Sequence, residues 1–168
     1  MTTATLTLTS TDSVRAMDAA RALPLDTRFT LGDEITPVQQ AFLSLNGYLH
    51  FRGAASQDEV DAIIAEIDRI QADWIAEKRW KVNGIPLFIG KDETGKKFVQ
   101  RMPFSSTFSE TIRDFVRDDR FLPVRGLIGS NTRVGDLEKD GVVFNQNLNV
   151  PGSAYPRLGW HTDGLRAL

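Results

Sequence analysis

The chain has 168 residues, of which 41% are hydrophobic and 25% charged, a composition typical of one globular domain. Its 20 Lys+Arg and 22 Asp+Glu residues leave a net charge of −2, so total charge gives no reason to expect nucleic acid or an anionic membrane as a partner. The absence of cysteine excludes disulfides and thiolate metal sites, so that a metal would have to be bound by His, Asp or Glu.

Targeting signals are not evident in the sequence. No apolar run approaches the roughly 18 residues of a membrane helix. The first residues are rich in Thr and Ser and lack the basic start and apolar centre of a signal peptide. We therefore expect a soluble, cytoplasmic protein.

The first part of the chain predicts a tail followed by two capped helices. Residues 1–33 have weak periodicity and favour a flexible N-terminal segment over an edge strand. Thr36-Pro37-Val38-Gln39 has the pattern of a capping box, which predicts a helix that ends at Gly47. A second capping box at residues 56–59 begins a helix with a long apolar face, predicted to end near residue 79.

Strands are predicted where the pattern alternates. Residues 48–52 alternate apolar and polar side chains and predict a half-buried strand. Residues 85–89 and 98–102 predict a hairpin around the polar turn 91–97. Residues 109–116 and 120–128 predict two short helices, with Pro123 in the first turn of the second. Beyond Ser130, extended segments predict a β region, in which Phe144, Gln146 and Leu148 share one face of a strand.

One short motif carries most of the chemical information. His161 and Asp163 flank Thr162 in a predicted strand, and residues two apart in a strand face the same side. An imidazole and a carboxylate can therefore reach one metal ion, as in the 2-His-1-carboxylate sites of non-haem iron oxygenases. A His-x-Asp alone is weak evidence, and a polar pair at a strand end is the alternative.

The order of several motifs resembles the phytanoyl-CoA dioxygenase family of Fe(II)/2-oxoglutarate oxygenases. The matching stretches are residues 46–53 (NGYLHFRG), 56–63 (SQDEVDAI), 115–129, 143–149 (VFNQNLN) and 160–163 (WHTD). Each stretch matches loosely, and the set in this order is more specific than any one of them.

The resemblance implies an α+β fold, in which N-terminal helices pack on the beginning of a double-stranded β-helix, or jelly roll. Residues 34–168 would form the N-terminal part of that domain, truncated just after the His-x-Asp motif. The family's later His and the Arg that binds 2-oxoglutarate find no match here, so the chain is expected to be a fragment without turnover of its own.

The resemblance also implies the site residues and the reaction. His161 and Asp163 would bind Fe(II), and Gln146 would lie beside the cosubstrate 2-oxoglutarate. The complete enzyme would hydroxylate a small organic substrate while 2-oxoglutarate is converted to succinate and CO2. His50 lies on the polar face of its predicted strand and is expected to be a surface histidine rather than a third ligand. The alternative is a non-catalytic module that binds a partner. The sequence leaves the substrate and the oligomeric state open.

Overall fold

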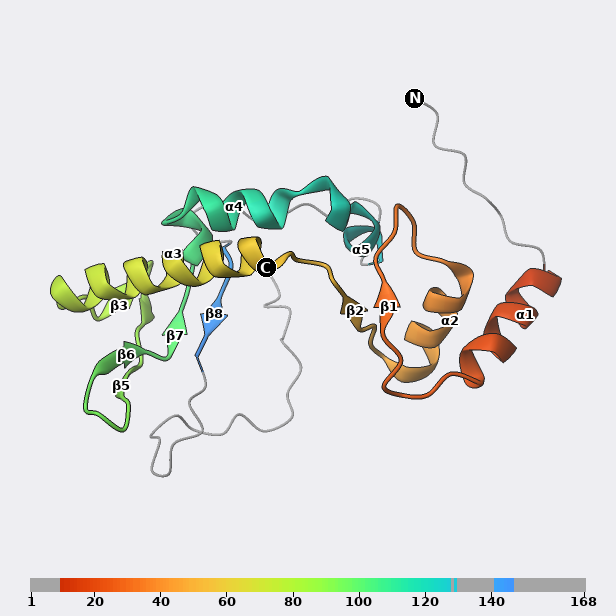
Figure 1. Ribbon diagram of the computed structural model, residues 1–168, viewed down its shortest axis with the longest axis horizontal. Coiled ribbons are helices and arrows are strands. Elements are labelled where there is room, and N and C mark those ends of the chain that lie inside the picture. Colours follow the sequence, from red (N-terminus) through yellow and green to blue (C-terminus); the bar gives the residue numbers. More distant parts are fainter. Residues whose placement is uncertain (1–9, 128, 130–140, 147–168) are drawn as a thin grey trace. The chain divides into compact units, whose positions relative to one another are not determined.

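The computed structural model describes residues 10–127, 129 and 141–146, and these residues form a mixed α+β fold (Figure 1). Their helices are α1 (Ser10–Arg21), α2 (Pro37–Asn46), α3 (Gln57–Ala76), η1 (Ser105–Thr107), α4 (Glu110–Arg117), η2 (Asp119–Phe121) and α5 (Leu122–Gly126). Their strands are β1 (Phe29–Thr30), β2 (Phe51–Arg52), β3 (Lys81–Val82), β4 (Ile85–Pro86), β5 (Ile89–Lys91), β6 (Lys97–Val99), β7 (Arg101–Met102) and β8 (Phe144–Asn145).

The α+β class is thus as predicted, whereas the described strands form two-stranded pairs and no jelly roll is seen among them. None of the described helices combines the length and the apolar character that a bilayer crossing requires. The chain divides into two compact units. The first comprises residues 1–61 and 114–134, and the second comprises residues 62–113 and 135–168.

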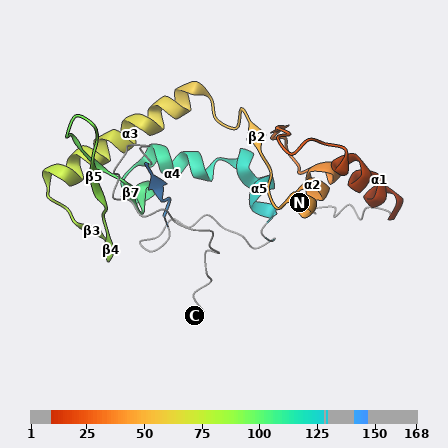
Figure 2. The ribbon, with the colours of Figure 1, turned by 90° about the horizontal axis from the view of Figure 1, so that it is seen from below.

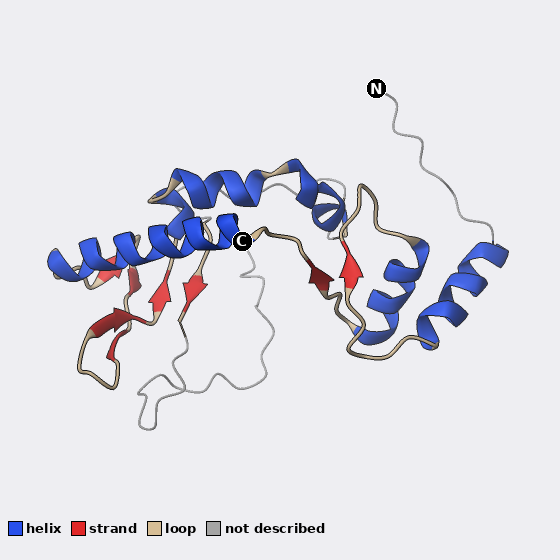
Figure 3. Ribbon diagram, in the orientation of Figure 1, coloured by secondary structure: helices blue, strands red, loops and turns tan. Residues whose placement is uncertain are grey.

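The first unit contains a helix where a tail was expected. Residues 10–21 form α1, and its Ala16 and Ala20 are buried against Ala41 and Phe42 of α2. Figure 3 shows the two helices of this pair in the first unit. The expectation of a flexible segment over residues 1–33 is therefore wrong for residues 10–21. Small alanines can be buried at a close helix contact without the large apolar face that marks a helix in the sequence.

Helix α2 begins and ends as its sequence predicts. The Thr36 hydroxyl accepts a hydrogen bond from the Gln39 backbone N–H (3.2 Å), and the Gln39 side chain accepts one from the Thr36 N–H (2.8 Å). Gly47 ends the helix with φ 80°, a left-handed conformation that glycine adopts without strain.

Strand β2 is shorter than the predicted strand and pairs in parallel with β1. The predicted alternation holds, because Leu49 and Phe51 are half-buried while Tyr48 and His50 are exposed. The Tyr48 hydroxyl donates a hydrogen bond to the Leu25 carbonyl, which fixes this segment.

Helix α3 begins in the first unit, and its residues from Ala62 onward provide much of the hydrophobic core of the second unit. The predicted capping box is present, since the Ser56 N–H donates to Glu59 (2.7 Å) and the Glu59 N–H donates to the Ser56 hydroxyl (3.2 Å). Further along the helix Ile67, Ile70 and Trp74 are almost fully buried. They pack with buried residues from the strands and α4, namely Val82, Val99, Met102 and Ile112.

The strands of the second unit follow one another as antiparallel neighbours. β3 pairs with β4, β5 with β6, and β7 with β8. Backbone bonds join these pairs: the Gln100 N–H donates to Phe88 (2.7 Å), and the Gln146 N–H donates to Gln100 (2.8 Å). Figures 1 and 2 show this group of strands beside α3. A hairpin surrounds the predicted polar turn, with Ile89 opposite Val99. The predicted strands 85–89 and 98–102 are each divided, because residues 85–86 pair with β3 and residues 101–102 pair with β8.

Two tight backbone features precede that hairpin. Asn83 and Gly84 have φ 45° and 82° and connect β3 to β4. Asn-Gly is the preferred pair for a two-residue hairpin turn with positive φ at both positions. Lys78 has φ 53° just after α3, a position where glycine is usual.

The two short helices near residue 120 agree with the prediction in outline. α4 begins after Ser109, whose hydroxyl accepts a hydrogen bond from the Ile112 N–H (3.2 Å). The second predicted helix is divided into η2 and α5, and Pro123 lies in the first turn of α5. Of the predicted β region, β8 falls within the described residues.

Candidate functional site

The predicted metal ligands His161 and Asp163 lie outside the described residues, so their geometry is not part of the structure. Among the described residues, no group of three or more His, Asp or Glu side chains is arranged to hold a metal ion. His50 is exposed at the start of β2, and its carbonyl accepts a hydrogen bond from the Phe29 N–H (2.8 Å). This environment matches the surface strand histidine that was expected.

Gln146, the predicted cosubstrate contact, lies directly after β8 and is half-buried. Its side-chain Nε2 donates to Gln71 Oε1 of α3 (3.1 Å) and approaches the Met102 sulfur at 3.7 Å. Phe144, two residues earlier, packs against the same core. The prediction that these two side chains share one face of the strand is confirmed, and the face is the one toward α3.

Gln71 accepts the hydrogen bond from Gln146 and connects it to the neighbouring strand. It is 9% exposed, and its Oε1 accepts a second hydrogen bond from the backbone N–H of Val99 (2.8 Å). One carbonyl oxygen therefore connects α3, β6 and the end of β8. The contacts hold the Gln146 amide at the border of the hydrophobic core. Sequence analysis did not single out Gln71, because a glutamine within a charged helix gives no signal of burial.

The basic residues near the hairpin are partly engaged by aromatic rings. The Arg79 guanidinium lies over the rings of Trp74 and Phe108, with centroid distances of 5.7 and 5.4 Å. The Lys81 ammonium lies 4.5 Å from the centroid of Trp80. Such cation–π contacts stabilise basic side chains at the protein surface.

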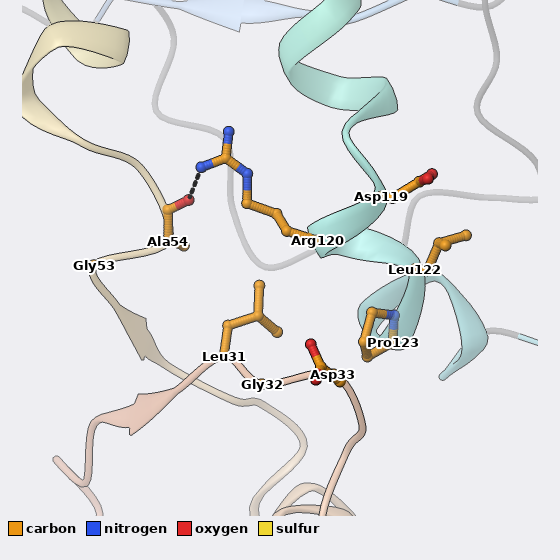
Figure 4. A pocket seen from close by; sticks show the side chains of 9 residues that line it. All are labelled: Leu31, Gly32, Asp33, Gly53, Ala54, Asp119, Arg120, Leu122 and Pro123. Carbon is orange, nitrogen blue, oxygen red and sulfur yellow. Dashed lines mark hydrogen bonds between the residues drawn. The ribbon is translucent and has the colours of Figure 1, made fainter.

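The first unit contains a separate cavity beside Arg120, with a volume of about 350 Å³ (Figure 4). It is lined by Leu31, Gly32, Asp33, Gly53, Ala54, Asp119, Arg120, Leu122 and Pro123. The first five of these residues directly follow the parallel strands β1 and β2. Figure 4 shows Arg120 extending from η2 toward Ala54.

Arg120 is held by several groups of its own unit. Its guanidinium forms an ion pair with Glu59, bonds to Asp118 (3.1 Å) and donates to the Ala54 carbonyl (3.3 Å). Its Nε is buried with no partner. Because the terminal nitrogens are occupied, this arginine connects α3 to η2 and has little capacity left to bind an anionic ligand. Sequence analysis missed this pair, whose members are 61 positions apart.

The two carboxylates with strongly lowered pKa values make stability depend on pH. The hydrogen bond from Arg120 lowers the pKa of Glu59 from 4.5 to about 2, and Arg69 does the same for Glu66, assisted by Ser109. A lowered folded-state pKa stabilises the fold above pH 4.5, and this contribution is lost as the pH falls through about 2.

We therefore expect the thermal midpoint to decrease between pH 5 and pH 2, as measured by circular dichroism. Glu59→Gln should lower the midpoint at neutral pH and reduce its dependence on pH in the acid range. An acid dependence that is the same in Glu59→Gln and the parent chain would show that the Glu59–Arg120 pair does not contribute.

Comparison with models of known protein families, with curated proteins and with solved structures finds no match to this chain. The resemblance to the phytanoyl-CoA dioxygenase family thus stays a prediction that depends on the sequence motifs.

Proposed function

We propose that this chain provides iron ligands of an Fe(II)/2-oxoglutarate-dependent dioxygenase that hydroxylates a small organic substrate. The observation that carries the proposal is the Trp160-His161-Thr162-Asp163 motif at the end of an ordered set of family-like stretches. In this proposal the described strands are the beginning of a jelly roll, and Gln146 lies beside the cosubstrate.

The donor chemistry of the proposed site suits ferrous iron. Imidazole and carboxylate are the ligands of facial-triad iron sites, which leave three positions open. Bound iron would supply dioxygen activation coupled to oxidation of 2-oxoglutarate. His161 and Asp163 would hold the metal, and Gln146 would present its amide from the end of β8.

Metal binding by the purified chain tests the proposed ligands. We expect Co(II), a spectroscopic substitute for Fe(II), to bind with a visible absorption change. His161→Ala should weaken this binding at least tenfold, because a two-ligand site loses half of its protein donors. The matched control is His50→Ala, which removes the other histidine of the chain and should leave Co(II) affinity unchanged.

Two results would contradict the proposal. One is the absence of Co(II) binding by the parent chain, and the other is equal weakening in His161→Ala and His50→Ala.

Succinate formation from 2-oxoglutarate is a separate test, for which we expect none from this chain alone. The only other histidine of the given sequence is His50, which is exposed.

A non-catalytic, partner-binding module is the second candidate function. Its support is that the described residues form two hydrophobic cores, one around Trp74 and one around Phe42. A cooperative thermal transition that does not depend on metal, together with no Co(II) binding, would support the module over the oxygenase.

A further inference from the structure

A groove of about 570 Å³ lies in the second unit between α3 and the hairpin of β5 and β6. On the helix side, Ala72, Ile75 and Ala76 provide an apolar floor. On the hairpin side, Lys96 and Lys97 form the rim and are exposed. The volume is within the range of small-molecule sites, which combine apolar walls with a few polar groups.

The hairpin places a like charge opposite Lys97, one of the two lysines of this rim. Lys91 of β5 is the cross-strand partner of Lys97 of β6, and directly opposed like charges destabilise a strand pair. No ion pair joins Lys91, Lys96 or Lys97 to a carboxylate among the residues that the structure describes. The nearby Asp92 carboxylate accepts hydrogen bonds from Thr94 and from the Lys96 backbone N–H (2.9 Å). Its pKa is lowered mainly by the Thr94 hydroxyl, and the charge of Lys96 also contributes.

The positive charge is a local feature of this part of the chain. Residues 78–101 contain seven Lys and Arg but only two Asp and Glu, whereas the whole chain has 20 and 22. The net charge of the whole chain therefore does not show the local excess of positive charge in residues 78–101. An anion at the groove would relieve the repulsion between the paired lysines.

We propose that this groove binds an amphipathic carboxylate, with its aliphatic body on Ala72, Ile75 and Ala76 and its carboxylate at Lys96 and Lys97. Ala72 and Ala76 are one helical turn apart, about 6 Å, so a medium-length aliphatic chain suits the floor. Asp68 also lines the groove and disfavours a second negative charge on the ligand. The groove uses none of the residues predicted to bind metal or cosubstrate, but Gln71 also lines it and accepts a hydrogen bond from Gln146 (3.1 Å).

Calorimetric titration with octanoate tests the proposal on the full chain. We expect saturable binding to the parent and at least tenfold weaker binding to the double variant Lys96→Gln/Lys97→Gln. Ala72→Leu should weaken binding to a similar degree, since it fills the groove without changing charge. Ala72 is an exposed helical position, so leucine there should leave the fold intact.

The matched control is Lys78→Gln/Lys81→Gln, which removes the same charge at residues that do not line the groove and should change affinity less than twofold. Acetate and phosphate should bind at least tenfold more weakly than octanoate, because they lack the aliphatic body.

Without ligand, the thermal midpoint of Lys97→Gln should be at least as high as that of the parent chain, because the variant removes one of the two opposed charges. No octanoate binding, equal weakening in the control, or equally tight binding of phosphate would overturn the proposal.

Discussion

Replacing Gly141 by alanine should destabilise the protein by about 1–3 kcal/mol, the usual cost of forcing an extra carbon into a packed site. A Cβ at Gly141 would lie 2.7 Å from the Phe104 Cα, a distance that requires the backbone to move. Urea denaturation followed by circular dichroism would measure the loss in the free energy of unfolding.

The backbone around this contact has little freedom to adjust. Phe104 has φ 59°, so this bulky residue already occupies the left-handed region. The Ser105 N–H donates to the Val142 carbonyl (2.8 Å), and the Val142 N–H donates to the Ser106 hydroxyl (3.1 Å). A shift of Phe104 away from a new methyl group would therefore strain both of these bonds.

Gly126→Ala is the matched control for this prediction. Apart from its chain neighbours and the backbone of its own helix, no atom lies within 4 Å of a Cβ built at Gly126, the last residue of α5. Alanine is favoured over glycine in a helix by about 0.5–1 kcal/mol, so this variant should be neutral or slightly more stable. If Gly141→Ala were as stable as Gly126→Ala, the close approach to Phe104 would not constrain the fold.

The sequence predicted well those elements that depend on residues close to one another along the chain. Both capping boxes, Thr36 with Gln39 and Ser56 with Glu59, involve side chains three positions apart. The hairpin around residues 91–97 is equally local. These signals need no knowledge of the rest of the chain, since the hydrogen bonds that fix them close within one turn.

The prediction missed two other features. One had a clear signal in the sequence, and the other had none. The Asn83-Gly84 turn is a strong hairpin signal that the prediction of a single strand at residues 85–89 overlooked. The left-handed Lys78 gives no signal, because lysine is unusual there. The long apolar face predicted for this helix is only partly buried, since Ile64 of α3 is 48% exposed.

At the candidate site, too, the sequence predicted what depends on neighbouring residues and missed a contact between distant ones. Period-two counting correctly placed Phe144 and Gln146 on one face, because strand geometry is local. It gave no indication of the partner, since Gln71 is 75 positions away and on a helix. His161 and Asp163 lie outside the described residues, so their assignment remains a prediction from the motif.

Gln71→Leu should lower the free energy of unfolding by about 1–3 kcal/mol, the typical cost of leaving a buried polar group unsatisfied. Gln71 Oε1 accepts from the backbone N–H of Val99, and Val99 is fully buried. Leucine keeps most of the side-chain volume but provides no acceptor, so the N–H would lose its partner inside the core. Urea denaturation gives the change directly.

Gln146→Leu separates the two hydrogen bonds that meet at Gln71. It removes the bond from Gln146 Nε2 but leaves the Gln71 oxygen paired with the Val99 N–H. The loss should therefore be smaller, about 0.5–1.5 kcal/mol for one partly buried bond. The double variant should lose less free energy of unfolding than the two single variants lose together. The reason is that each single change already breaks the hydrogen bond between Gln71 and Gln146. Equal costs for the two single variants would mean that the Val99 N–H does not depend on Gln71, and that Gln146 itself is the residue that stabilises this junction of helix and strands.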